Sequence, residues 1–267
     1  MASALAAPVQ AQDAITADEY LNYLHSLKSV VAPKESRSAA TVGIPSGFTI
    51  PANVGFAAVA FSDKRERGDK NDTDASAALG FGFGDAVSGV GVDLIIGLSS
   101  VGKGQGGGFD AADFGDSGSL NVKVSRQFAS PIQSGQVASL SLGVGRAVTW
   151  GDAEDTDPSY ILAMSSGFTY GTKPGALPGM VTIGYGTDIG TFEDMDGLIF
   201  GLGVGLTDWL STGVSWYGDE AIAGLTTKTR LTRNLDMQMG LSYSDVAHQN
   251  SDGRWVLSFA LIDKKLF

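Results

Sequence analysis

The sequence predicts an all-β fold, a closed antiparallel up-and-down transmembrane β-barrel of about twelve strands with a short N-terminal helix. Three observations predict this fold. From about residue 54 to the end, apolar side chains alternate with small or polar ones, which is the period of a β-strand. The connections between these segments are alternately long and short. Glycine is abundant, with 37 residues among 267, whereas the apolar fraction of 43% is that of an ordinary folded protein.

Composition excludes several classes of protein. The chain has no cysteine, which excludes disulfide scaffolds, thiolate zinc sites and cysteine nucleophiles. Its formal net charge of −11 argues against binding to nucleic acid, because phosphates require a basic face. No apolar run reaches the roughly 18 residues that a membrane-spanning helix needs, which excludes a helical inner-membrane protein. A β-strand crosses lipid with only about 9 to 11 residues and one apolar face, so a transmembrane barrel passes this test.

Residues 1–11 are interpreted as the remainder of an export signal. Val9, Gln10 and Ala11 have the small-x-small form of a signal-peptidase site, although no basic region and almost no apolar stretch precede them. An ordinary flexible, alanine-rich terminus is the alternative interpretation.

Residues 12–53 are expected to form a periplasmic helix and linker. Thr16 and Glu19 make a capping-box pair at the start of the helix. Apolar side chains then recur on one helical stripe, at Tyr20, Leu21, Leu24, Leu27 and Val31. Prolines and small residues predict an extended linker from 32 to 53, so the barrel itself is expected over 54–267.

Alternation defines the strands one by one. Leu235, Met237 and Met239, for example, are separated by Asp236, Gln238 and Gly240, which no helix would show. An even number of antiparallel strands places the two chain ends of the barrel region on the same side of the membrane. The twelve predicted strands lie near 54–62, 75–84, 89–100, 118–128, 137–150, 159–170, 179–187, 197–206, 209–217, 220–231, 235–245 and 253–262.

The connections alternate in character along the barrel. The long ones are polar and mostly acidic, at 63–74, 101–117, 151–158, 188–196 and 247–253, whereas 85–88, 207–208 and 232–234 are tight turns. Long loops on one side and short turns on the other are typical of a bacterial outer-membrane barrel. In such a barrel the apolar stripe faces lipid and the glycine and serine stripe faces inward. A soluble β-sandwich or lipocalin-like barrel, with the apolar stripe turned inward, is the alternative.

Two stretches carry a resemblance to a known class. Residues 205–217 and 231–243 each resemble the strand, periplasmic turn and strand of Gram-negative outer-membrane β-barrel proteins, and the chain ends in Phe267 as many of them do. The resemblance covers roughly 54–267 and implies a porin-like barrel of about twelve strands, but it does not identify the subfamily. It implies location in the bacterial outer membrane, contact with its lipid, and recognition by the barrel-insertion machinery. Lys265 and Asp263 interrupt the terminal alternation, so Phe267 is expected to trail the last strand.

Aromatic residues near strand ends are expected to form the two membrane-interface girdles. These residues are Trp150, Tyr160, Trp216 and Trp255 on the loop side, with Tyr170 and Trp209 on the turn side. Arg146 is the exception to the lipid-facing pattern, because it follows Leu142 and Val144 in the outward register. A β-bulge, or a position near the outer interface, would allow this arginine to avoid lipid.

Polar residues in the inward register are the candidate pore-lining residues. They are Asp93, Asn121, Lys123, Lys228, Arg230 and Gln238, with Asp236 as a further candidate. Groups of mixed sign could line a narrow aqueous path and set its selectivity. Alternatively, they could pair with one another across a plugged lumen. A partial opening is expected, obstructed by the N-terminal helix or by the glycine-rich loop 101–117.

The expected function is a narrow passive diffusion channel for small polar solutes, with no enzymatic activity and no cofactor. A closed structural or surface-interaction barrel is the first alternative, followed by an autotransporter-type translocator and an outer-membrane lipid hydrolase. His25 and His248 are the only imidazoles available for catalysis. Acidic loops could hold divalent cations, although a solvated acidic surface is favoured because no calcium-loop spacing is matched. The acidic loop residues that could bind cations are Asp110, Asp113, Asp116, Asp152, Glu154, Asp155 and Asp157. The oligomeric state is left open.

Overall fold

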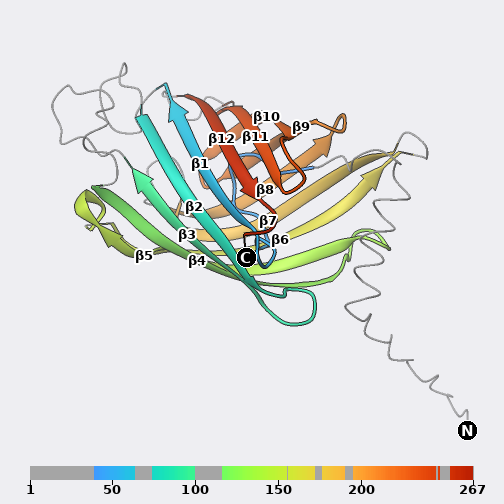
Figure 1. Ribbon diagram of the computed structural model, residues 1–267, viewed down its shortest axis with the longest axis horizontal. Helices are drawn as coiled ribbons and strands as arrows, with labels where there is room; N and C mark the ends of the chain where they lie inside the picture. Colours follow the sequence, from blue (N-terminus) through green and yellow to red (C-terminus); the bar gives the residue numbers. More distant parts are fainter. Residues whose placement is uncertain are drawn as a thin grey trace, which may run out of the picture.

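The computed structural model is a closed barrel of twelve antiparallel strands, in which β1 closes the ring by pairing with β12 (Figure 1). The structure describes residues 39–63, 74–99, 116–154, 156–171, 176–189, 195–244, 246 and 253–266. The strands are β1 (Gly55–Ser62), β2 (Asp74–Gly84), β3 (Gly91–Ser99), β4 (Ser117–Ala129), β5 (Val137–Trp150), β6 (Ser159–Tyr170), β7 (Leu177–Ile189), β8 (Met195–Gly205), β9 (Leu210–Tyr217), β10 (Glu220–Arg230), β11 (Leu235–Tyr243) and β12 (Trp255–Asp263). A short 3-10 helix, η1 (Gly151–Ala153), follows β5.

The strand prediction is confirmed, and no predicted boundary is more than two residues from the observed one. Each strand pairs with its neighbours in sequence, which is the up-and-down order. One connection on the long-loop side is short, because β9 and β10 are joined by Gly218 and Asp219 alone. The last strand ends at Asp263, where the apolar alternation is interrupted. The predicted helix 16–31, the export-signal segment 1–11 and most of loop 101–117 lie outside the described residues.

The apolar stripes face outward. Large side chains such as Leu142, Leu162 and Leu198 are more than half exposed, while most of the completely buried residues are small or polar, for example Ser139, Ser165 and Thr182, with Ile189 and Ile199 as the large apolar exceptions. A water-soluble fold shows the reverse, since it buries Leu, Phe and Ile together. A continuous outward apolar surface over a polar interior is the arrangement of a transmembrane barrel, so the soluble sandwich alternative is wrong. None of the described residues forms a helix long and apolar enough to span a membrane.

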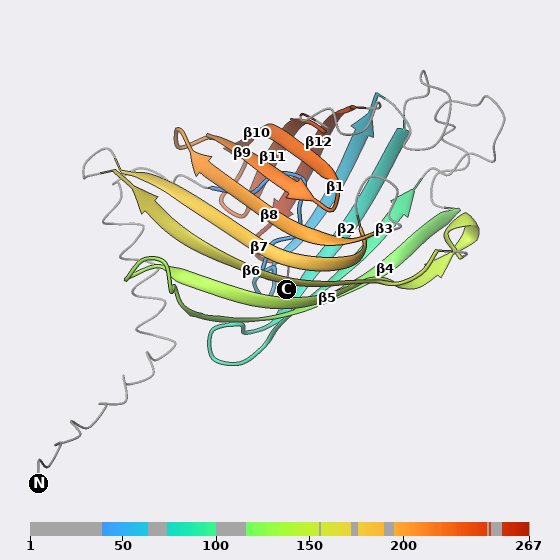
Figure 2. The same ribbon diagram turned by 180° about the vertical axis from the view of Figure 1, so that it is seen from behind.

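The described end of the predicted linker lies inside the barrel. Residues 39–54 form no part of the sheet, and their trace is enclosed by the ring of strands in both views (Figure 2). The segment starts beside the turn-side ends of β8 and β9, where Ala40 adjoins Gly203 and Gly213. From there it runs toward the loop side, where its Gly43 adjoins Ile222 of β10. It then returns to the turn side and continues into β1. We call residues 39–54 the lumen segment.

Two β-bulges allow the Arg146 side chain to avoid lipid. The pairing of β4 with β5 shifts between Leu120 and Val122, and Arg146 itself adopts a left-handed φ of 54°. Its guanidinium is thereby directed to carbonyl oxygens, donating from Nε to Asp157 O (2.7 Å) and from Nη2 to Asp188 O (3.1 Å). Asp188, with a φ of 50°, lies in the second bulge, between β7 and β8. The bulges therefore give this arginine polar partners near the loop-side rim.

The predicted girdle aromatics lie near both ends of the barrel. Tyr170 and Trp209, on the turn side, are 71% and 57% exposed, which suits side chains at a lipid–water interface. On the loop side, Tyr160 and Trp255 are exposed, and Trp255 packs on Tyr243 with ring centroids 5.0 Å apart. Trp150 and Trp216 are half-buried. The role of all six aromatic residues at the membrane interface remains a prediction.

Candidate functional site in the barrel lumen

The interior wall has a cradle of glycines that fits the lumen segment. A Cβ atom added at Gly201 would meet Ile44 and Thr41, and one added at Gly203 would meet the Ala40 carbonyl oxygen. On the opposite wall, Gly82 and Gly91 leave room for residues 49–51 in the same way. These four glycines belong to alternating small-residue stripes of β2, β3 and β8. Part of the glycine excess in the sequence is thus explained by close approach of a second backbone.

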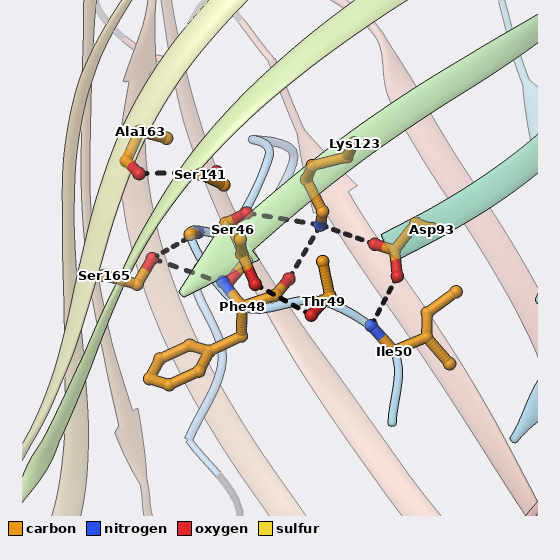
Figure 3. Close-up of polar contacts among 11 residues, drawn as sticks. Ser46, Phe48, Thr49, Ile50, Asp93, Lys123, Ser141, Ala163 and Ser165 are labelled. Atoms are coloured by element: carbon orange, nitrogen blue, oxygen red, sulfur yellow. Dashed lines mark hydrogen bonds and ion pairs between the residues drawn. The ribbon is translucent and has the colours of Figure 1, made fainter. Parts of the chain in front are cut away.

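Lys123 and Asp93 hold the middle of the lumen segment (Figure 3). The two residues are directly paired across β3 and β4, and the ammonium lies 2.9 Å from the Asp93 Oδ2 atom. Lys123 Nζ also donates to the carbonyl oxygens of Phe48 (2.7 Å) and Ser46 (3.3 Å). Asp93 Oδ1 accepts a hydrogen bond from the Ile50 backbone N–H at 2.7 Å. The ion pair therefore binds both a donor and two acceptors of the segment backbone.

Hydroxyl groups of the wall bind the segment on either side of this ion pair. Ser165 Oγ of β6 accepts from the Gly47 N–H (2.8 Å) and lies 2.6 Å from the Thr182 Oγ1 atom of β7. Thr49 Oγ1 lies 2.8 Å from the Ser125 Oγ atom of β4. Because all of these wall groups are buried, their polar atoms are satisfied largely by the segment and by one another.

We call the group formed by Asp236, Lys228, Arg230 and Lys264 the turn-side cluster. Asp236 is almost fully buried, and its carboxylate receives Lys264 Nζ at 2.6 Å, Lys228 Nζ at 3.3 Å and Arg230 Nε at 3.9 Å. The three cations keep a third to a half of their side-chain surface exposed. Three cations thus share this one carboxylate.

The other predicted lumen residues lie in different parts of the barrel. Asn121 of β4 accepts a hydrogen bond from the Arg146 N–H (2.9 Å) through its side-chain oxygen, so it supports the bulge near the loop side. Gln238 of β11 pairs in register with Lys228 of β10, next to the turn-side cluster. A further ion pair joins Arg254 to the buried Glu220 at 3.5 Å, at the loop-side end. The structure thus separates the predicted residues into Asp93 and Lys123 under the lumen segment, a group at the turn side, and Asn121 near the loop side.

Sequence analysis did not identify the hydroxyl contacts or the lumen segment itself. Ser125, Ser165 and Thr182 occupy the small-residue stripe and carry no signal that distinguishes them from other inward serines. The pairing of Lys123 with Asp93 could have been predicted from the sequence, because two inward residues of opposite charge lie on adjacent predicted strands. His248 and most residues of the acidic loops, including Asp110, Asp113 and Asp155, lie outside the described residues. The hypothesis of divalent cation binding there therefore stays a prediction.

Comparison with known proteins gives a fold but no family. No protein-family model matches the chain, and no curated protein matches it. Among solved structures, it is similar to the KdgM porin in complex with disordered oligogalacturonate, with a TM-score of 0.50, 7% identity, and coverage of 79% of this chain and 98% of that chain. It also matches the COG4313 outer membrane channel from Pseudomonas putida F1, with a TM-score of 0.46, 10% identity, and coverage of 80% and 96%. The likeness to the KdgM porin shows a shared β-barrel fold.

Proposed function

We propose that this barrel lies in the bacterial outer membrane and acts as a narrow passive diffusion channel for small polar solutes. The single observation that carries the proposal is the opposite character of its two faces. The outward face is apolar, and the inward register carries hydroxyls and half-exposed cations such as Lys228 and Arg230. An interior of this kind is compatible with water, whereas the exterior is compatible only with lipid. Insertion by the barrel-assembly machinery and contact with outer-membrane lipid belong to the same proposal.

The narrowness follows from the lumen segment. Its backbone lies between the walls formed by β2 to β4 and by β8 to β10, where it takes space that solutes would otherwise use. We propose that Asn121, Lys228, Arg230 and Gln238 line the remaining path, that Asp93 and Lys123 belong to the part of the wall covered by the lumen segment, and that the turn-side cluster favours anions at its mouth. The proposed channel requires no catalytic group.

A closed structural barrel is the second candidate, and one observation favours it. The buried polar groups around the lumen segment pair with it closely, as they would in a permanently plugged interior. Planar-bilayer recording of the refolded chain separates the two functions. Discrete current steps whose ion selectivity changes in a Lys228→Glu variant support a channel, because a structural barrel has no selectivity to change. Persistent absence of current supports the closed barrel.

A further inference from the structure

We propose that the lumen segment is a displaceable plug and that Lys123 is the residue that holds it in place. This inference rests on the proposed channel function and adds its regulation: conductance is low when residues 39–54 are seated in the glycine cradle and high when they leave it. The structure offers three lines of support, namely the way the segment is attached, the position of Lys123, and the shape of the wall.

The attachment is polar and does not involve strand pairing. None of residues 39–54 belongs to a strand of the sheet, and the segment bonds to the wall through its backbone at its end, where the Val54 carbonyl oxygen accepts from the Gly82 N–H (3.0 Å). Its middle is fixed instead by discrete contacts, at Gly47 with Ser165, at Thr49 with Ser125, and at Ile50 with Asp93. Hydrogen bonds of this kind contribute little net stability when water can replace the partner. A few such contacts can be exchanged for water without unfolding the barrel, whose strands pair independently of them.

Lys123 occupies the central position among these contacts. Its ammonium joins the wall carboxylate of Asp93 to two carbonyl oxygens of the segment, while the Asp93 carboxylate binds the Ile50 N–H. Replacement by methionine keeps a chain of similar length but removes the ion pair with Asp93 and both hydrogen bonds to the segment. The Asp93 carboxylate then loses its cation in a buried place and gains by becoming hydrated, which requires the segment to move away.

The wall supplies an independent way to displace the segment. Alanine at Gly203 would place a methyl group against the Ala40 carbonyl and close to the Thr41 N–H, which are backbone atoms of the segment. Gly143 of β5 is a matched control, because it also faces inward and pairs with Lys123, yet a Cβ there has its closest contacts at 3.8 Å. Both substitutions replace an inward strand glycine by alanine, and they differ in the space available beside the lumen segment.

The experiment combines a disulfide lock with these variants. The chain has no native cysteine, and the hydroxyl oxygens of Thr49 and Ser125 are 2.8 Å apart, so Thr49→Cys with Ser125→Cys can join the segment to β4. Single-channel conductance of the full-length protein is recorded for the wild type, Lys123→Met, Gly203→Ala and Gly143→Ala. Lys123→Met is also recorded with the cysteine pair, oxidised and then reduced.

We expect Lys123→Met and Gly203→Ala to raise conductance several-fold and Gly143→Ala to match the wild type. Oxidation of the cysteine pair should return Lys123→Met to the wild-type level, and reduction should restore the increase. The plug is contradicted if the disulfide fails to form in the refolded protein, or if it forms and conductance stays unchanged while the wild type still conducts. Absence of current from every variant, including reduced Lys123→Met, would instead contradict the channel itself.

Discussion

The two groups of charged residues inside the barrel differ in stoichiometry and in what they bind. Under the lumen segment, one cation meets one carboxylate, and both are largely buried, with side-chain exposures of 20% for Lys123 and 1% for Asp93. In the turn-side cluster, three cations surround the carboxylate of Asp236, and they remain 34% to 53% exposed. The first group uses its hydrogen bonds to hold a backbone, whereas the second keeps charge available to solvent.

This difference shows that inward register alone does not define a pore-lining role. Lys123 and Lys228 occupy equivalent places in the alternation, and both pair with a carboxylate on an adjacent strand. Their roles diverge because a segment from outside the sheet covers the first and not the second. Substitutions in the two groups should therefore have different effects on stability and on ion selectivity.

The largest expected effect is on the free energy of unfolding. Lys123→Met removes the cation of a buried pair, which typically costs about 3 to 5 kcal/mol, and this is the upper limit here because displacement of the lumen segment lets the Asp93 carboxylate become hydrated. Lys228→Met should cost about 1 kcal/mol or less, because Lys264 and Arg230 still neutralise Asp236 and Lys228 is well exposed. Urea unfolding in detergent, followed by the mobility difference between folded and unfolded chain, measures both. Displacement of the lumen segment would lower the cost for Lys123→Met, but an equal effect of the two variants would contradict the distinction.

The next effect concerns ion selectivity. Asp236→Asn leaves three cations without their carboxylate at the turn-side mouth, so the reversal potential in a salt gradient should shift clearly toward anions. Asp93→Asn leaves only Lys123 uncompensated, at a site covered by the lumen segment, and should produce a smaller shift. Both shifts should shrink at high ionic strength. A larger shift for Asp93→Asn would mean that the path runs beside that pair and not beside the turn-side cluster.

The smallest effect lies outside both groups, in the turn between β2 and β3. Hydrogen bonds from the Ser88 hydroxyl (2.6 Å) and the Val87 N–H (2.9 Å) hold the pKa of the exposed Asp85 carboxyl below its ordinary value. A depressed folded-state pKa gives stabilisation that is present above the unfolded-state pKa and is lost as pH falls through the folded-state value. Asp85→Asn should therefore unfold slightly more easily than the wild type at pH 7, and the difference should vanish under strongly acidic conditions. A difference that persists there would assign the effect to geometry and not to charge.

Much of the fold could be predicted from the sequence because each strand has its own two-sided pattern. In β11, Leu241 faces outward and Gln238 inward, and this follows from the period alone. The lumen segment could not be predicted, since residues 39–54 have no periodicity and their partners, such as Gly203 and Ser165, are more than a hundred residues away in sequence. Lys264 was also missed in the turn-side cluster, because it follows the last strand and has no register. Long-range contacts to irregular backbone leave little trace in local patterns.

The transmembrane orientation requires the apolar stripe to face lipid and the polar stripe to face water, and β10 allows a direct test of this. Leu225 is 46% exposed on the outward face, and Lys228, three residues later, is 41% exposed on the inward face. Leu225→Cys and Lys228→Cys variants, each carrying the same small fluorophore on its single thiol, are reconstituted into vesicles with or without brominated acyl chains. We expect brominated lipid to quench the label at position 225 and aqueous iodide to quench the label at position 228. Quenching of the label at 225 by iodide and not by brominated lipid would contradict the transmembrane orientation, and with it the channel and its plug.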